Sequence, residues 1–464
     1  MRTTKINKLI STLNPMDYST EPYILDKHCV DWRGEYIGDS DLIIFPKNTK
    51  QISSILEFCN KENIQIVPQG GNTGLVGGGV PRKDQKEIII NLSRMNKIRK
   101  IDSIGNTITL ESGCILDNVK NELMKYEFEF PLSMGSRGNC QIGGNLATNA
   151  GGVNVIKYGT IRQSVLGIEA VLASGKIYSS LKNIKKNNTG FDIKNLLIGS
   201  EGTLGIITAA TIQLYPLPKE KIVIWVSFEN FAKVLDFYVY MNRKFKDLIT
   251  SFEFMNKESI EILEKHECKL NNLRRNQCYC LVELSNFHQI DNFSNFIASS
   301  IELNRFDNNE FILSKSEEEN RIFWKYRESI PLAERKENFI IPHDVSIPLI
   351  NIDKFVNDTT KKIRFFSRSS IIINFGHLGD NNLHFNVLIN DSEKKNKLSI
   401  KNSVNKIVFD NVSKYEGAIS AEHGIGQLRR EELKKHKDLS EIETMKNIKK
   451  VFDPKNILNP GKIF

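Results

Sequence analysis

Three glycine-dense segments in the first 206 residues constrain the fold of this 464-residue chain more than any other feature. The first holds six glycines between residues 70 and 79, shortly after the strand-like run 64–67. The others span 143–152 and 199–205. Glycine permits positive φ and close approach of the backbone to a ligand, so successive N–H groups can converge on phosphate oxygens. The pattern therefore favours a cradle for a phosphate or pyrophosphate.

Neither of two familiar phosphate-binding patterns accounts for the first segment. The glycine spacing excludes G-x-G-x-x-G, and Val80 and Pro81 follow Gly79 where a P-loop would require lysine and a hydroxyl residue. Tight turns on a closely packed scaffold would use any single one of these loops equally well. Three such loops in one half of the chain favour a binding site for a large dinucleotide over purely structural turns.

Composition places the chain among globular proteins. With 40% hydrophobic and 26% charged residues it can bury a sizeable core, and a prior of about 150 residues per domain predicts about three structural units. A net charge of +9 over this length gives no indication of nucleic-acid binding. The seven cysteines are odd in number and contain no C-x-x-C pair, which favours reduced thiols and a cytoplasmic location.

Membrane insertion and secretion are not expected. No apolar run approaches the roughly 18 residues of a transmembrane helix, and the start of the chain lacks the apolar region of a signal peptide. The basic and hydroxyl-bearing residues around Arg2 also fit the remnant of a mitochondrial presequence. The mitochondrial matrix is therefore the alternative location.

Short β-branched runs alternate with helical spacing from about Asp41. The runs 42–45, 64–67 and 371–375 read as strands, and the stretches 49–60 and 427–437 read as helices. Thr49 is the expected N-cap of the first helix, which makes a β-α-β unit with the strands on either side. Glycine content falls after Pro216-Leu217-Pro218, which indicates a domain boundary there.

Three of the eight histidines lie in two compact motifs, 376–386 and 420–426. Along a straight strand His377 and His384 would lie roughly 23 Å apart, whereas nitrogens that share a metal each lie within about 2.1 Å of it. The intervening Gly-Asp-Asn-Asn is turn chemistry, so the chain can fold back and bring both imidazoles together. Two hydrogen-bonded histidines beside a surface turn would also fit this spacing.

Glu422 and His423 are adjacent, and neighbours on an extended chain face opposite ways. This suggests two different roles, one as a ligand and one acting on substrate. An ordinary turn before a helix would have the same appearance. Arg327, taken alone, reads as a charged residue on a helix.

The glycine motifs resemble the FAD-binding domain of the vanillyl-alcohol-oxidase superfamily. They read Pro-Gln-Gly-Gly-Asn-Thr-Gly at 68–74, Gly-Gly-Asn-x-Ala-Thr-Asn-Ala-Gly-Gly at 143–152 and Gly-Ser-Glu-Gly-Thr-Leu-Gly at 199–205. Within the superfamily the chain resembles the D-2-hydroxyacid dehydrogenase branch, and the D-2-hydroxyglutarate dehydrogenases most of all. The resemblance runs from about Asp31 to Pro460 and therefore covers nearly the whole chain.

The resemblance implies an α+β fold: a two-subdomain FAD-binding domain, an α+β cap domain and a C-terminal segment that returns to the FAD domain. The expected parts are an N-terminal segment at 1–37, the FAD-binding domain at 38–218, the cap or substrate domain at 219–415, and a C-terminal segment with the catalytic motif at 416–464.

The resemblance also implies which residues line the FAD. These are Pro68, Gly70, Gly71, Asn72, Thr73, Gly74, Leu75, Pro131, Gly135, Ser136, Gly143, Gly144, Thr148, Gly151, Gly152, Glu201, Gly205, Ile207 and Asn459. Some relatives tether the flavin through a histidine in the first loop. Asn72 stands there in this chain, so the expected FAD is non-covalent.

By matched position, His377, His384 and Glu422 are the expected ligands of a divalent metal, usually read as Zn²⁺, and His423 is the expected catalytic base. Arg327 and Asn386 match residues that bind the substrate. Asn381 departs from the family, where glycine is usual. Because asparagine tolerates positive φ better than most residues, we expect the turn to survive.

The implied activity is oxidation of a D-2-hydroxyacid, with hydride passing to the flavin while the base takes the hydroxyl proton. D-2-hydroxyglutarate, giving 2-oxoglutarate, is the leading substrate. Pro342 and Pro331 replace a lysine and a threonine of better-matching relatives, so the second carboxylate could lack a partner. D-lactate or glycolate oxidation therefore stays an alternative, as does a non-catalytic flavin-binding electron-relay subunit.

The expected partners are a small 2-hydroxyacid and a separate electron acceptor, with no nucleic acid. No nicotinamide site is recognisable in the sequence, which favours an electron-transfer flavoprotein, a quinone or a cytochrome as acceptor. The sequence leaves the oligomeric state open, and a homodimer is one candidate.

Overall fold

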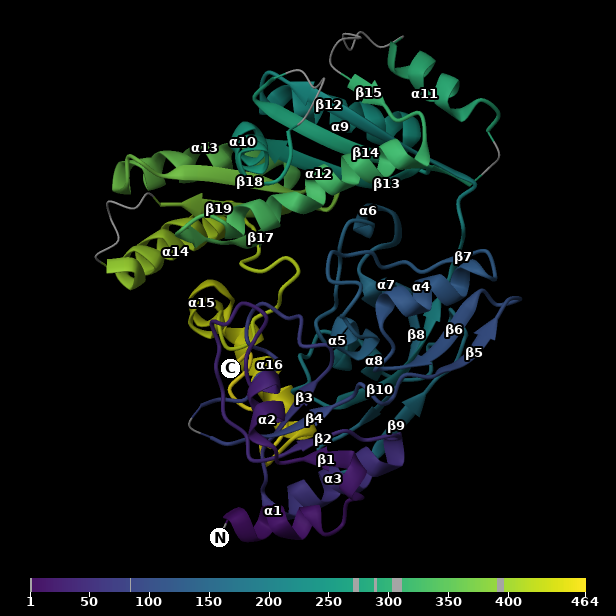
Figure 1. Ribbon diagram of the computed structural model, residues 1–464, viewed down its shortest axis with the longest axis vertical. Helices are drawn as coiled ribbons and strands as arrows, with labels where there is room; N and C mark the ends of the chain where they lie inside the picture. Colours follow the sequence, from purple (N-terminus) through teal and green to yellow (C-terminus); the bar gives the residue numbers. More distant parts are fainter. Residues whose placement is uncertain (1, 84, 270–274, 288–289, 303–310, 390–395) are drawn as a thin grey trace. The chain divides into compact units, whose positions relative to one another are not determined.

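The computed structural model describes residues 2–83, 85–269, 275–287, 290–302, 311–389 and 396–464. The chain forms two compact units, the first comprising 1–151, 158–216 and 422–464 and the second comprising 152–157 and 217–421 (Figure 1). Both units combine helices with sheets, which confirms the expected α+β class. The finer boundaries expected at 37/38, 218/219 and 415/416 stay predictions.

The first unit contains a small sheet with a parallel core. Its strands lie in the order β1 (Tyr18–Ser19), β2 (Ile43–Ile44), β4 (Ile88–Asn91) and β3 (Ile66–Gln69), and both β2 and β3 run parallel to β4. Helix α3 (Thr49–Glu62) connects β2 to β3 and buries one apolar side, so the expected β-α-β unit is present. Its N-cap is Asn48, which corrects the expectation of Thr49. The Thr49 hydroxyl instead donates to Glu169.

A five-stranded antiparallel sheet also lies in the first unit. Its order is β5 (Ile98–Asp102), β6 (Thr107–Glu111), β10 (Ile206–Gln213), β8 (Val165–Val171) and β9 (Ile177–Ser180). The central strand β10 is buried throughout and follows the third glycine segment directly. Helix α5 (Ile142–Ala147) begins at the second segment. The core of this unit therefore lies directly behind its glycine loops.

Most of the remaining elements of the first unit are short, and α16 (Leu439–Phe452) is the longest of them. They are α1 (Arg2–Ile10), η1 (Pro15–Asp17), α2 (Pro22–His28), α4 (Leu116–Met124), β7 (Phe128–Glu129), α7 (Ile161–Ser164), α8 (Ile193–Leu197), β11 (Tyr215–Pro216), α15 (Arg430–His436) and α16 (Leu439–Phe452). The helix expected at 427–437 begins only at Arg430, because the Gln427 backbone N–H and side chain bind carbonyl groups of the first glycine loop. Helix α6 (Val155–Tyr158) lies where the chain passes between the two units.

An eight-stranded sheet forms the centre of the second unit. Its order is β15 (Phe311–Leu313), β12 (Glu220–Phe228), β14 (Cys278–Asn286), β13 (Ile249–Asn256), β18 (Ile371–His377), β19 (Asn382–Leu388) and β16 (Ile340–Ile341), and β17 (Asp344–Ser346) also pairs with β19. The strand expected at 371–375 thus continues to His377.

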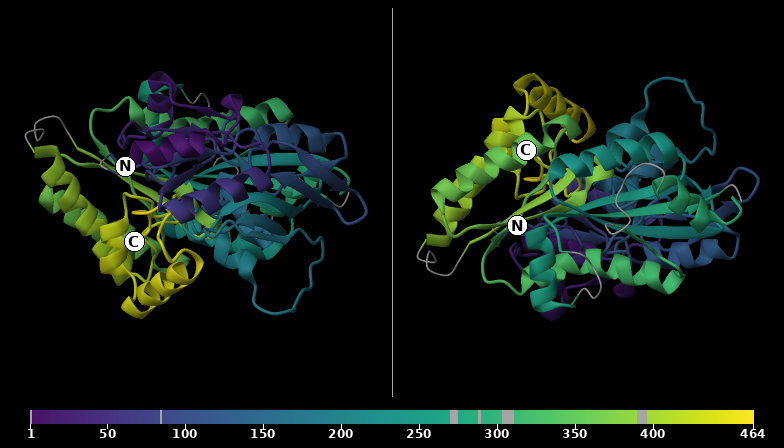
Figure 2. Two further views of the ribbon diagram at one scale, coloured as in Figure 1. Left: turned by 90° about the horizontal axis from the view of Figure 1, so that it is seen from below. Right: turned by 90° about the horizontal axis from the view of Figure 1, so that it is seen from above.

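Helices cover both faces of this sheet (Figure 1 and Figure 2). Apolar side chains of α10 (Lys257–His266) and α12 (Glu317–Arg335) pack on one face. Those of α9 (Phe231–Phe245), α11 (Phe293–Glu302), α13 (Leu349–Phe366) and α14 (Lys397–Lys414) pack on the other. Phe252 and Phe254 of β13 (Ile249–Asn256) pack on the face covered by α9, α11, α13 and α14. Because side chains alternate along a strand, Glu253 between them faces α10 and α12. Every helix in the described part of the chain is too short or too polar to cross a bilayer.

Candidate active site

The three glycine segments meet within the first unit. A Cβ added at Gly71 would lie 2.0 Å from the Asn139 carbonyl oxygen, and one at Gly202 would lie 2.6 Å from Pro68 Cγ. Contacts under 3 Å are closer than real Cβ atoms tolerate. These two glycines therefore serve the packing of one loop against another.

Other glycines of the expected cofactor site border open space. Nothing lies within 4 Å of a Cβ added at Gly74, Gly135 or Gly144. Near Gly70, the buried Oε1 of Gln141 has no hydrogen-bond partner among the described residues. Open backbone beside an orphaned polar atom is what a polar ligand would fill, so these residues fit the expected FAD.

Most of the expected cofactor residues lie on the loops of the first unit. They fall on β3 and the loop after it (Pro68, Gly70, Gly71, Asn72, Thr73, Gly74, Leu75), before α5 (Pro131, Gly135, Ser136), in and after α5 (Gly143, Gly144, Thr148, Gly151, Gly152), at the third segment and β10 (Glu201, Gly205, Ile207) and near the C-terminus (Asn459). Only Gly152 belongs to the second unit. Their contact with FAD stays a prediction, and Gln141 is a candidate that the motif comparison missed.

Glu201 anchors the C-terminal segment to the third glycine segment. Its two carboxylate oxygens accept the backbone N–H groups of Ile425 and Gly426, each at 2.7 Å. Burial raises the pKa of Glu201, and the two N–H groups oppose that rise. Asn459 donates its amide to the Glu201 carbonyl oxygen at 2.7 Å. The expected base, His423, lies two residues before Ile425, so this carboxylate secures the chain that carries it.

The two histidines of the second unit meet across a hairpin. Strand β18 ends at His377, the turn η2 (Leu378–Asp380) follows, and β19 carries His384 opposite Phe375. The imidazole centroids lie 5.5 Å apart. Asn381 ends the turn with φ of 71°, which confirms that asparagine accepts the conformation expected of glycine. The fold-back expected from the turn residues is therefore present.

Glu253 is the most consequential residue that motif comparison missed. It lies on β13 opposite His377, and its Oε1 accepts the His377 Nδ1–H at 2.7 Å. Its Oε2 lies 2.8 Å from both Nε and Nη2 of Arg327. Burial acts to raise the pKa of Glu253, but the neighbouring His377 and Arg327 outweigh it and hold the pKa below its usual value. A lone carboxylate between Phe252 and Phe254 was the signal that could have drawn attention to it.

Arg327 lies on α12 and is buried, which differs from a charged residue on an exposed helix face. The contacts with Glu253 occupy one edge of its guanidinium, and the group also lies 4.7 Å above the Phe375 ring centroid. No hydrogen bond or ion pair joins Nη1 to any residue that the structure describes. That nitrogen can still donate to a carboxylate of a ligand.

Asn386 already has protein partners for its amide. It lies two residues after His384 on the same side of β19 and donates to both carboxylate oxygens of Glu334, at 2.8 and 3.0 Å. Its Oδ1 accepts the His343 N–H at 3.1 Å. The Asn386 side chain thus links β19 to His343 and to α12. Its expected contact with substrate stays a prediction.

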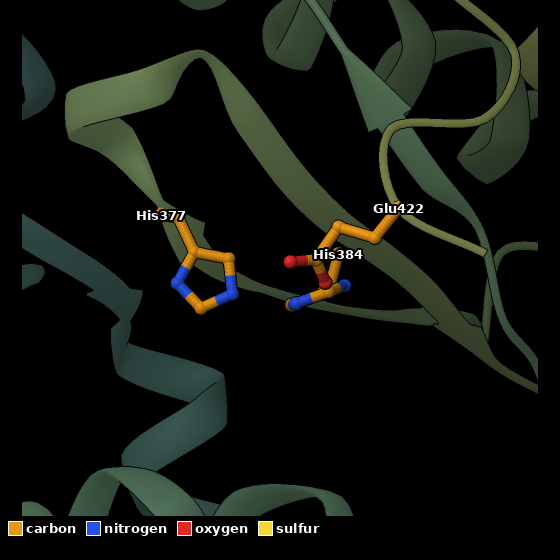
Figure 3. A group of neighbouring side chains, drawn as sticks. All are labelled: His377, His384 and Glu422. Carbon is orange, nitrogen blue, oxygen red and sulfur yellow. The ribbon is translucent and has the colours of Figure 1, made fainter. Parts of the chain in front are cut away.

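His377, His384 and Glu422 form a group that could hold a metal ion. Each offers one ligand atom, and these atoms all lie within 4.8 Å of one another (Figure 3). Glu422 follows Ala421, whose N–H donates to the Asp344 carbonyl oxygen at 3.3 Å. Two imidazoles and one carboxylate are a donor set that suits Zn²⁺.

A second group overlaps the first. Asp344, Glu422 and His423 also offer ligand atoms within 4.8 Å of one another. Asp344 accepts the amide of Asn382 at 2.8 Å and lies 3.7 Å from His384 Nδ1. The role of His423 as the catalytic base stays a prediction.

The chain matches two family models. Residues 217–463 match the family described as FAD linked oxidases, C-terminal domain, and residues 40–180 match the FAD binding domain. Among solved structures, p-cresol methylhydroxylase with substrate bound has a TM-score of 0.78 at 15% identity, with 99% of this chain and 96% of that one covered. Alkyldihydroxyacetonephosphate synthase has a TM-score of 0.76 at 17% identity, with 98% and 84% covered. These likenesses confirm the fold.

Sequence relatives extend over nearly the full chain. A Schizosaccharomyces pombe protein provisionally named a mitochondrial D-lactate dehydrogenase is 36% identical, with 98% of this chain and 88% of that one covered. An Arabidopsis thaliana protein named D-2-hydroxyglutarate dehydrogenase, mitochondrial, is 35% identical, with 98% and 83% covered. A Saccharomyces cerevisiae protein named D-2-hydroxyglutarate–pyruvate transhydrogenase is 33% identical, with 93% and 88% covered. The chain belongs to the FAD-linked oxidases of the vanillyl-alcohol-oxidase superfamily, in the branch of the D-2-hydroxyacid dehydrogenases.

Proposed function

We propose that this chain oxidises a D-2-hydroxyacid to the 2-oxoacid with non-covalent FAD as the immediate acceptor, and that D-2-hydroxyglutarate is its substrate. The observation that carries the proposal is the hairpin of His377 and His384, joined through Glu253 to Arg327 in one buried polar layer of the second unit. The names of the Arabidopsis thaliana and Saccharomyces cerevisiae relatives support the choice of substrate.

Oxidation of a 2-hydroxyacid removes the hydroxyl proton and a hydride from Cα. FAD, when bound, supplies the hydride acceptor. A divalent metal, which we propose to be Zn²⁺, would be held by His377, His384 and Glu422 and would supply a Lewis acid for the hydroxyl group.

Side chains of this protein would bind the substrate and accept its proton. His423 takes the hydroxyl proton on its imidazole. The open Nη1 of Arg327 donates to the carboxylate next to Cα, and the Phe375 ring beneath the guanidinium limits its movement. This contact would fix the direction of the Cα–H bond, which is what hydride transfer requires. Asn386 is our further candidate for a contact with substrate.

D-Lactate or glycolate is the competing substrate within the same fold. The provisional name of the Schizosaccharomyces pombe relative favours it, and Pro331 and Pro342 stand where a second carboxylate would otherwise find lysine or threonine. The test is kcat/KM of the FAD-loaded enzyme with an artificial dye acceptor on one-carboxylate and two-carboxylate D-2-hydroxyacids. We expect D-2-hydroxyglutarate to have the highest value, and a clear preference for D-lactate would overturn the choice of substrate.

The electron acceptor after FAD is a separate question. We propose an electron-transfer flavoprotein, a quinone or a cytochrome, and the name of the Saccharomyces cerevisiae relative adds pyruvate to the acceptors worth testing. Reoxidation of the substrate-reduced enzyme by each acceptor in turn would separate them. An electron-relay subunit without its own chemistry would not be reduced by substrate at all.

Location and assembly are also proposals. The cysteine content favours the cytoplasm, whereas the word mitochondrial in the names of two relatives favours the matrix. Fractionation of cells followed by immunoblotting separates the two locations. A homodimer is the assembly that we would test by light scattering.

A further inference from the structure

Glu253 is a buried charge and the only carboxylate on β13. It lies between Phe252 and Phe254 of β13 and is fully buried. Taking a carboxylate out of water costs several kcal/mol unless hydrogen bonds and opposite charge compensate. Here both oxygens are engaged, one by His377 and the other by Arg327.

The contact with Glu253 determines which ring nitrogen of His377 carries the proton. A carboxylate can only accept, so the His377 Nδ1 that lies 2.7 Å from Glu253 carries the proton. The lone pair of the imidazole is then on Nε2. Figure 3 shows the second ring nitrogen of His377 on the side of His384 and Glu422. The tautomer imposed by Glu253 is therefore the one that can bind a metal at that point.

The contact with Arg327 determines which edge of the guanidinium is left for a ligand. Nε and Nη2 both lie 2.8 Å from the same oxygen of Glu253. The guanidinium is planar, and it is held between this carboxylate and the face of Phe375. Its free direction is then the Nη1 side.

We propose that Glu253 is a positioning residue that serves both halves of the site: it holds His377 in the Nδ1–H tautomer for metal binding and Arg327 with Nη1 free for the substrate carboxylate. The proposal rests on the proposed function for the substrate half. The metal half can be tested without substrate.

The substitution Glu253→Gln separates this role from simple packing. An amide has one accepting oxygen, and Arg327 is a permanent cation that has only donors. The amide oxygen of the new glutamine will therefore face Arg327, and its NH₂ group will face His377 Nδ1. His377 Nδ1 must then accept a hydrogen bond from that NH₂ group. His377 is thereby forced into the Nε2–H tautomer, which cannot ligate. We expect the affinity of the FAD-loaded enzyme for Zn²⁺ to fall 10- to 100-fold in a chelator competition.

A double variant provides the rescue. In Glu253→Gln with Arg327→Met, no cation competes for the amide oxygen, so it can accept from His377 Nδ1–H again. We expect the affinity for Zn²⁺ to recover, although Arg327 itself is lost. A residue that served only packing would show a larger defect in the double variant and no recovery.

The matched control is Glu283→Gln. Glu283 is also buried, lies on the neighbouring strand β14 and contacts the same helix, accepting the Trp324 indole N–H at 2.8 Å. It binds Thr250 and Lys221 rather than His377 or Arg327. We expect this variant to keep its affinity for Zn²⁺.

Nitrogen NMR of the histidine rings gives the most direct measurement. We expect His377 of the wild-type protein to be protonated at Nδ1, and at Nε2 in Glu253→Gln. Wild-type affinity for Zn²⁺ in Glu253→Gln, no recovery in the double variant, or an Nε2–H tautomer in the wild type would each overturn the proposal. If Glu253→Gln fails to fold, the tautomer of His377 in the wild type and the Zn²⁺ affinity of the double variant still test the proposal. Failure of the wild type to oxidise any D-2-hydroxyacid would instead overturn the proposed function and leave the metal half standing.

Discussion

Replacing Glu201 by methionine should release the segment that carries the expected catalytic base. Methionine fills a similar volume and accepts no N–H group, so the backbone donors of Ile425 and Gly426 lose their partners. An unsatisfied buried donor costs about 1–3 kcal/mol, so two donors should cost about 2–6 kcal/mol. Glu201→Gln keeps one accepting oxygen and should cost about half as much.

Hydrogen exchange of the FAD-loaded protein measures this loss where it occurs. The chain has two units, and global unfolding need not be two-state, whereas exchange of the Ile425 and Gly426 amides reports local opening. A loss of 2 kcal/mol corresponds to about 30-fold faster exchange. We expect these two amides to exchange fastest in Glu201→Met, more slowly in Glu201→Gln and most slowly in the wild type. Exchange of these two amides at the wild-type rate in Glu201→Met would refute the reasoning, because the carboxylate would then not hold them.

Three further predictions concern the base, the metal and a buried lysine. His423→Ala should keep its FAD, measured by absorbance, while reduction of the flavin by substrate slows about 10²- to 10⁴-fold; an unchanged rate would exclude His423 as the base. Chelation should abolish turnover and added Zn²⁺ should restore it, and full activity after verified metal removal would argue against a role for the metal. Burial lowers the pKa of Lys462 to about 8 although Glu87 opposes it, so the unfolded chain holds more protons between that pH and the usual lysine value. Stability of the wild type should therefore rise with pH across this window, by up to about 3 kcal/mol relative to Lys462→Met, and parallel denaturation profiles of the two proteins would contradict this.

The parts of the site that depend on local chemistry could be predicted from the sequence. Gly-Asp-Asn-Asn between His377 and His384 predicts a turn, and the hairpin follows. The dense glycines predict loops that converge. They do not say which glycine packs and which borders a ligand, because Gly71 and Gly74 differ only in what other segments place beside them.

The parts that depend on distant partners could not be predicted in this way. Arg327 lies on the buried side of α12 because Glu253, 74 residues earlier, supplies a carboxylate there. Asn386 has the spacing of a substrate contact, yet its amide is taken by Glu334 from α12. A buried polar side chain is defined by its partner, and strand register and helix packing decide that partner. The unexpected charge at Glu253 was visible in the sequence, whereas its two roles were not.

The most direct test of the central claim is anaerobic addition of D-2-hydroxyglutarate to the purified, FAD-loaded protein while the visible flavin absorbance is followed. We predict that the oxidised flavin band disappears within a single turnover and that 2-oxoglutarate appears in an amount equal to the flavin. A flavin spectrum that stays unchanged with D-2-hydroxyglutarate, D-lactate and glycolate would contradict the assignment as a D-2-hydroxyacid dehydrogenase.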